Sequence, residues 1–74
     1  MSGSREPKLF DLVAVIAGQT DSDVATGDVG TVVELLPPGG LEVEFLDQGG
    51  RTLSVTTLNV KDVLVLNRER TKVA

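Results

Sequence analysis

The residues best placed to do chemistry are three glutamates on two neighbouring predicted strands. Glu42 and Glu44 alternate with apolar residues, and Glu34 ends an apolar run just before a Pro-Pro-Gly-Gly turn. A hairpin there brings Glu34 opposite Glu42 or Glu44, so all three carboxylates share one outer sheet face. Such a face is either a solvated surface that discourages edge pairing or a docking surface for a basic partner.

A second acidic group lies in the polar loop of residues 18–28. Asp21, Asp23 and Asp28 supply oxygen atoms of the kind that divalent cations bind. Their spacing does not match an EF-hand loop, so a solvated loop is favoured, with Asp28 bonded to its own backbone. We predict no metal site and no cofactor, and we group Asp28 with the three glutamates as a candidate partner-binding residue.

Nucleophilic chemistry has little support in this chain. Four hydroxyl residues follow in one short segment, but the chain contains no histidine and no cysteine. A hydroxyl needs an activating base to act as a nucleophile, and nothing in the sequence places Lys61 near these residues. The sequence therefore predicts a non-enzymatic protein, with ordinary strand hydroxyls at Thr52, Ser54, Thr56 and Thr57.

Charge argues against nucleic acid as the main partner. The 74 residues form one domain with a net charge of −4, and residues 9–66 carry nine acids against Arg51 and Lys61, a net −7. An acidic domain repels phosphate backbones, and Phe10 and Phe45 are too few for a base-stacking platform. No apolar run is long enough for a membrane helix and no signal peptide is visible, so we expect a cytoplasmic protein.

Five short strands must position these groups. The pattern predicts strands at residues 9–17, 29–36, 41–46, 52–57 and 63–66, with a turn near Asn59 and Asp62 that suits one turn of 3₁₀ helix. Tight hairpins and a long first loop favour an all-β, five-stranded SH3-like barrel over residues 9–66, with an OB-like barrel as the alternative. Residues 1–8 are expected to be a flexible arm, and residues 67–74 a flexible charged tail.

Alternation predicts which side chains fill the core. Leu41, Val43 and Phe45 are expected to point inward from the third strand, and Leu53 and Val55 from the fourth. The first and last strands are apolar on both faces. Either these terminal strands close on one another, or they form a homodimer or partner interface.

The segments 9–14, 27–34, 41–45, 53 and 63–64 resemble an uncharacterised bacterial family of small stand-alone proteins, frequent in cyanobacteria. The resemblance covers residues 9–66, and the motif of residues 27–34 is its most specific part. The family carries no assigned activity and no catalytic residues. What the resemblance implies is a small barrel with an antitoxin or immunity role.

The stretch Gly27-Asp28-Val29-Gly30-Thr31-Val32 is also similar to the KOW motif of ribosomal and transcription-factor SH3-like domains. KOW domains usually add basic residues, whereas the neighbours here are acidic. We interpret Gly27 and Gly30 as geometric, bending the second strand so that the barrel closes. We therefore predict a protein-interaction module that docks a basic protein. The alternative is an RNA- or ribosome-associated domain acting through its basic termini, with Arg68, Arg70 and Lys72.

Overall fold

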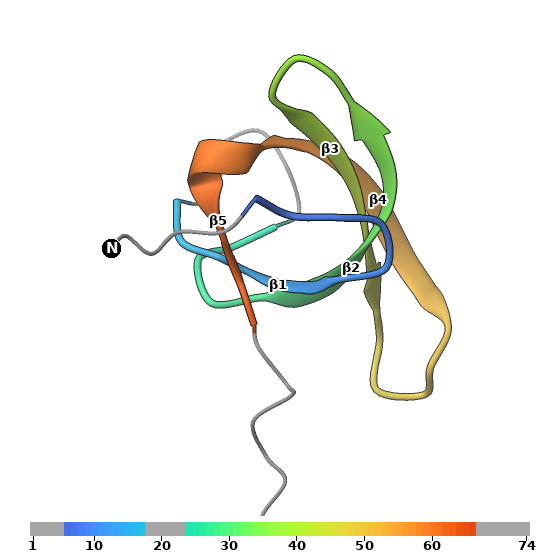
Figure 1. Ribbon diagram of the computed structural model, residues 1–74. Coiled ribbons are helices and arrows are strands. Elements are labelled where there is room, and N and C mark those ends of the chain that lie inside the picture. Colours follow the sequence, from blue (N-terminus) through green and yellow to red (C-terminus); the bar gives the residue numbers. More distant parts are fainter. Residues whose placement is uncertain (1–5, 18–23, 67–74) are drawn as a thin grey trace, which may run out of the picture.

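Five antiparallel strands and one short 3₁₀ turn make up the described part of the chain (Figure 1). The computed structural model describes residues 6–17 and 24–66, so the predicted tail and most of the predicted arm lie outside the described residues. The elements are β1 (Leu12–Val15), β2 (Val29–Leu36), β3 (Gly40–Leu46), β4 (Thr52–Asn59), the 3₁₀ turn η1 (Val60–Asp62) and β5 (Val63–Val65).

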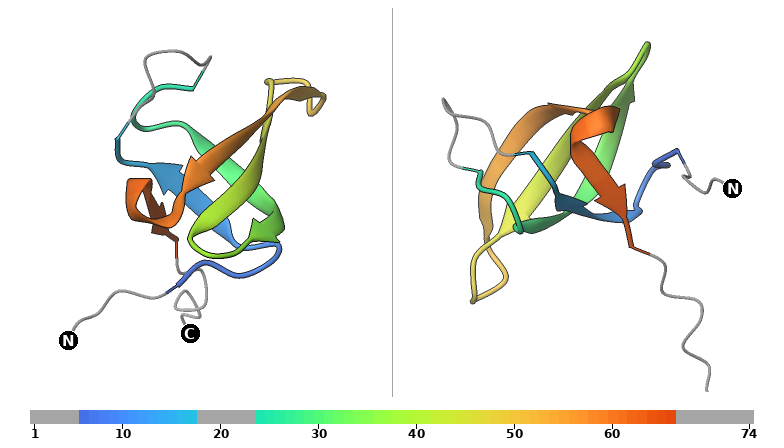
Figure 2. Two further views of the ribbon diagram at one scale, coloured as in Figure 1. Left: turned by 90° about the horizontal axis from the view of Figure 1, so that it is seen from above. Right: turned by 90° about the vertical axis from the view of Figure 1, so that its left-hand side faces the viewer.

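The strands form a single sheet in the order β4-β3-β2-β1-β5, and the sheet curls around one core (Figure 2). In the described part of the chain, β4 pairs only with β3 and β5 only with β1, so hydrogen bonds do not close the barrel. The predicted all-β class and the number of strands are confirmed. The predicted 3₁₀ turn is also present, and the Asn59 side chain caps it by accepting a hydrogen bond from the Lys61 amide.

The first strand is shorter than predicted. A turn precedes β1, in which the Asp11 amide donates to the Lys8 carbonyl and the Asp11 carboxylate accepts from the Lys8 amide at 2.8 Å. Phe10 sits at the tip of this turn with φ of 70° and is 73% exposed. The backbone of Phe10 and Asp11 still bonds to Val32 of β2, so the positive φ of Phe10, and not a loss of pairing, interrupts the strand before Leu12.

Alternating apolar residues from every strand fill the core, and Val24 joins them from the end of the first loop. In β1, Val13 and Val15 point into the core. Ile16 follows on the opposite face of the chain and is exposed. The predicted inward positions of β3 are confirmed. The buried core residues are Val13, Val15, Val24, Val32, Leu41, Val43, Phe45, Leu58 and Val63.

The prediction for β4 is wrong. Leu53 and Val55 are 63% and 52% exposed, and Leu58 is buried instead. The pairing with β3 shifts at Phe45, which faces Ser54, while Leu46 faces Thr52. Leu53 is therefore the extra residue of a β-bulge. Beyond the bulge, Val55 lies on the outer face opposite Glu44, and Leu58 lies on the core face opposite Leu41.

Gly30 is required for close packing between β2 and β3. A Cβ atom at this buried position would lie 2.7 Å from the Glu44 carbonyl oxygen and 2.7 Å from a methyl carbon of Val43. The irregularity of β2 falls further along, at Val33, between the pairs that Val32 and Glu34 make with β3. Gly27, by contrast, does adopt a conformation with φ of +98°, which favours glycine.

Candidate functional site

The three glutamates lie on the outer face of β2, β3 and β4, in two rows that cross the strands. Glu34 is paired with Glu42, and Glu42 in turn with Thr57. Glu44 occupies the neighbouring row, between Thr31 and Val55. We call the surface of Glu34, Glu42 and Glu44 the acidic face.

The sequence predicted that Glu34 opposes Glu42 or Glu44, and the first alternative is correct. Val32 faces Val43, and the next pair along the two strands is Glu34 with Glu42, so Val33 has no partner in β3. The bulge at Val33 reconciles these facts, since one unpaired residue returns Glu34 to the outer face. Two like charges placed directly opposite each other on neighbouring strands are destabilising, so this pair opposes folding slightly.

Two hydroxyl groups of β4 hold the carboxylates of β3. Thr57 Oγ1 donates to Glu42 Oε2 at 2.9 Å, and Thr52 Oγ1 donates to Glu44 Oε2 at 2.6 Å. Both carboxylates are thereby drawn toward β4. Sequence reasoning took these threonines as ordinary strand residues. The sequence carries no signal for these contacts, because they depend on the register between β3 and β4.

The acidic face has no cation beside it in the described part of the chain. Glu34 is exposed and has no hydrogen bond or ion pair there, and the only partners of Glu42 and Glu44 are the two threonine hydroxyls. No lysine or arginine among the described residues forms a salt bridge with them. Within residues 6–17 and 24–66, no salt bridge neutralises the negative charge of this face.

Asp28 does not belong to the acidic face. It lies three positions before Thr31, the partner of Glu44, and so about 10 Å along the chain from the nearest row of the acidic face. Its carboxylate accepts a hydrogen bond from the Ala25 amide at 2.9 Å, and its amide donates to the Ala25 carbonyl at 3.0 Å. Asp28 thus closes the turn that precedes β2, which agrees with the predicted backbone role.

The predicted acidic loop cannot be assembled from described residues, because Asp21 and Asp23 lie outside them. Within the described ranges, no group of three or more acidic, histidine or cysteine residues is arranged to hold a metal ion. The same part of the chain contains no helix long and apolar enough to cross a membrane.

A second exposed surface lies over β2, β1 and β5. Val29 faces Ala14, and Ala14 faces Leu64, which makes an apolar row across three strands. Val29 and Leu64 are 51% and 54% exposed, and Ile16 lies two residues beyond Ala14 and is also exposed. We call the surface of Ala14, Ile16, Val29 and Leu64 the apolar face.

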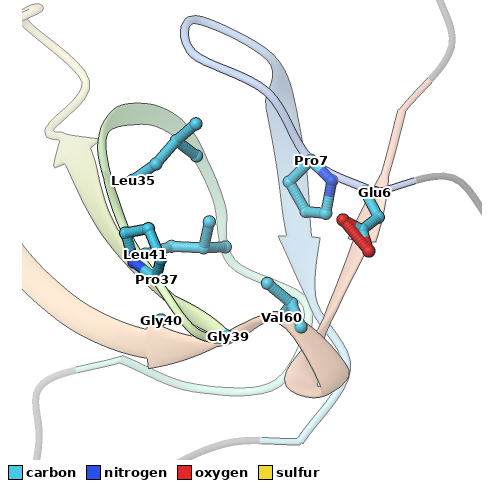
Figure 3. A pocket seen from close by; sticks show the side chains of 8 residues that line it. All are labelled: Glu6, Pro7, Leu35, Pro37, Gly39, Gly40, Leu41 and Val60. Carbon is cyan, nitrogen blue, oxygen red and sulfur yellow. The ribbon is translucent and has the colours of Figure 1, made fainter.

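A small hollow of about 150 Å³ separates the segment before β1 from the β2–β3 turn (Figure 3). Glu6 and Pro7 line one side, and Leu35, Leu41 and Val60 face them. Typical ligand pockets measure about 300–1,000 Å³, so this hollow is small for a metabolite. Its lining offers one carboxylate and no nucleophile, and consists of Glu6, Pro7, Leu35, Pro37, Gly39, Gly40, Leu41 and Val60.

Comparison with known proteins gives a family without an activity. No curated protein and no solved structure matches the chain. A family model described as a domain of unknown function, DUF4926, matches residues 9–65, which span β1 to β5. The resemblance to an uncharacterised family is thus confirmed at this level, and the chain belongs to the DUF4926 family.

Proposed function

We propose that this domain is a non-catalytic interaction module whose acidic face docks a basic protein. The observation that carries the proposal is the alignment of Glu34, Glu42 and Glu44 on one outer face without a cation beside them. Complementary charge speeds encounter between proteins and selects against partners of the same sign. An antitoxin or immunity role, in a bacterial stand-alone protein, is one use of such docking.

The pairing of Glu34 with Glu42 supports a role beyond solvation. Like charges directly opposite each other cost some stability, and lysine would blunt a strand edge equally well. The hydroxyls of Thr52 and Thr57 also fix two of the carboxylates in position. A preorganised acceptor surface loses less side-chain entropy when a partner binds.

The test is a charge reversal with a defined probe. Glu34→Lys combined with Glu44→Lys should weaken binding of an end-capped, lysine-rich octapeptide by more than tenfold at 50 mM salt, measured by calorimetry. Glu6→Lys combined with Asp62→Lys changes the net charge by the same four units away from the acidic face, so it is the matched control and should change the affinity less than threefold. Equal weakening by both variants would show that only net charge matters and would refute the docking surface.

A homodimer through the terminal strands is the second candidate, and the exposed apolar face favours it. The row Val29, Ala14 and Leu64 is uncharged and self-complementary in chemistry, as a twofold interface requires. This contact would leave the acidic face accessible in each copy. Light scattering over a concentration series tests it.

The nucleic-acid alternative rests on residues outside the described ranges. Arg68, Arg70 and Lys72 would have to bind phosphates beside a turn similar to the KOW motif. The described surface over β2, β3 and β4 carries the opposite charge. Binding of RNA that weakens steeply with salt and requires these three residues would favour this alternative over protein docking.

A further inference from the structure

The free edge of β4 is unprotected. In the described part of the chain β4 pairs only with β3, so its other side carries unused backbone donors and acceptors. Its eight residues, Thr52–Asn59, include no charge, no proline and no glycine. Natural edge strands are usually blunted by lysine, proline or short length, because an open edge pairs with other chains.

The hydrogen-bond pattern shows which groups face outward. The Val60 amide donates to the Gly39 carbonyl at 2.9 Å, which continues the register of Gly40 with Asn59. Bonded and non-bonded pairs alternate along an antiparallel ladder, so Leu41–Leu58 and Val43–Thr56 are bonded pairs. Val55 and Thr57 fall between them, and their amide and carbonyl groups point to the free edge.

The negative charge lies beside the same edge. The carboxylates of Glu42 and Glu44 are drawn toward β4 by the hydroxyls of Thr57 and Thr52. A strand added next to β4 would run about 5 Å away from it. Lysine or arginine side chains on the outer face of that strand would reach both carboxylates.

We propose that the basic partner binds by adding one antiparallel β-strand to the free edge of β4, with lysine or arginine at two alternate positions over Glu42 and Glu44. Backbone bonds to Val55 and Thr57 supply register, and the carboxylates supply selectivity. This inference rests on the proposed docking function and specifies its geometry. Residues opposite Val55 and Thr57 share their outer face, so the partner's basic residues are those whose amides face β4.

Charge favours a partner over a second copy at this edge. Two β4 strands paired about 5 Å apart would bring the carboxylates of Glu42 and Glu44 from both copies within roughly 10 Å of one another. That separation is about one Debye length at physiological salt, so the repulsion would be only partly screened. A strand with lysine or arginine on that face replaces this repulsion with ion pairs.

The experiment uses an end-capped octapeptide of alternating lysine and valine and two N-methylated versions. One version is methylated at the lysine amides and the other at the valine amides. The unmodified peptide should bind the full chain. Methylation of the lysine amides should weaken binding at least tenfold, because these amides face β4, whereas methylation of the valine amides should change it less than threefold.

Protein variants complete the design. Glu42→Gln with Glu44→Gln should weaken the unmodified peptide at least tenfold. Val55→Pro should do the same, since it removes an edge-facing amide that β3 does not use. The peptide comparison remains decisive if Val55→Pro fails to fold. Amide exchange at Val55 and Thr57 should slow when the peptide binds.

The outcomes separate this inference from the proposed function. If both methylated peptides bind as well as the unmodified one while the glutamine variants still bind weakly, docking on the acidic face stands and strand addition is wrong. If the glutamine variants bind normally, the proposed function fails. A dimer that Val55→Pro converts to monomer would assign the edge to self-pairing and overturn the inference.

Discussion

The acidic face and the apolar face are two outer surfaces of the same curled sheet, and β2 contributes to both. The first half of β2 places Val29 beside Ala14, and the second half places Glu34 beside Glu42. Both faces lie outside one core, so burial within this chain explains neither composition. The proposed docking of a basic protein uses the charged face, and the proposed homodimer uses the apolar face.

The position where β2 passes between the two faces is Gly30. It is buried, and a side chain there would meet β3 at van der Waals overlap. A side chain larger than that of glycine at position 30 would push β2 away from β3. Because β2 contributes to both faces, this shift would change both of them. A substitution here tests whether the faces depend on one another.

Gly30→Ala should have the largest effect on the fold. The added methyl group lies 2.7 Å from the Glu44 carbonyl oxygen, which is backbone and cannot move aside cheaply. We expect a loss of about 3 kcal/mol in the free energy of unfolding, measured by urea denaturation. Gly50→Ala is the control, because its φ of +85° is strained for alanine but the space is open, and about 1 kcal/mol is expected. Equal losses in both variants would refute the close-packing argument.

Leu64→Glu should weaken self-association through the apolar face and leave the acidic face unchanged. The side chain is 54% exposed at the end of the apolar row, so the charge would disrupt a contact between copies without entering the core. If the apolar face forms a dimer, its dissociation constant should rise at least tenfold by light scattering. Leu46→Glu, at an exposed position beside the β3–β4 turn, should leave the constant unchanged. A wild-type mass that is monomeric at every concentration would exclude the dimer.

Glu34→Gln should stabilise the fold by a smaller amount, through a change in the acidic face alone. It removes the repulsion between Glu34 and Glu42, which occupy directly opposite positions. We expect the free energy of unfolding to rise by about 0.5 kcal/mol at low salt. The gain should shrink in 1 M salt, where the Debye length falls to about 3 Å. A gain that is independent of salt would mean that charge is not its source.

The sequence predicts the class, strand number and most strand positions because turn residues separate short apolar runs and the alternation in β3 is regular. Leu41, Val43 and Phe45 alternate with acids, so their inward direction follows from the pattern. The acidic face is predictable for the same reason, since any hairpin between these strands places Glu34 with Glu42 or Glu44.

The errors occur where one residue interrupts the alternation. A bulge at Leu53 exchanges the two faces of β4, and nothing in its run of hydroxyl and apolar residues shows which phase faces the core. The bulge at Val33 is equally hidden, because both its neighbours in β2 suit a regular strand. The hydroxyl contacts of Thr52 and Thr57 depend on that register, so they could not be assigned before it was known.

Asp28→Ala should have the smallest effect on stability and on peptide binding. It tests whether the docking surface extends beyond Glu34, Glu42 and Glu44 to the start of β2. The substitution removes a hydrogen bond to the Ala25 amide in an exposed turn, so we expect a loss of about 0.5 kcal/mol in stability. Its charge lies about 10 Å along the chain from the row of Thr31 and Glu44, about one Debye length at physiological salt, and further from β4, where the peptide is proposed to bind. The affinity for the lysine–valine peptide should therefore change less than twofold by calorimetry, although a negative charge has been removed. A tenfold loss would extend the docking surface to the start of β2 and would place the partner along the whole strand instead of at the edge of β4.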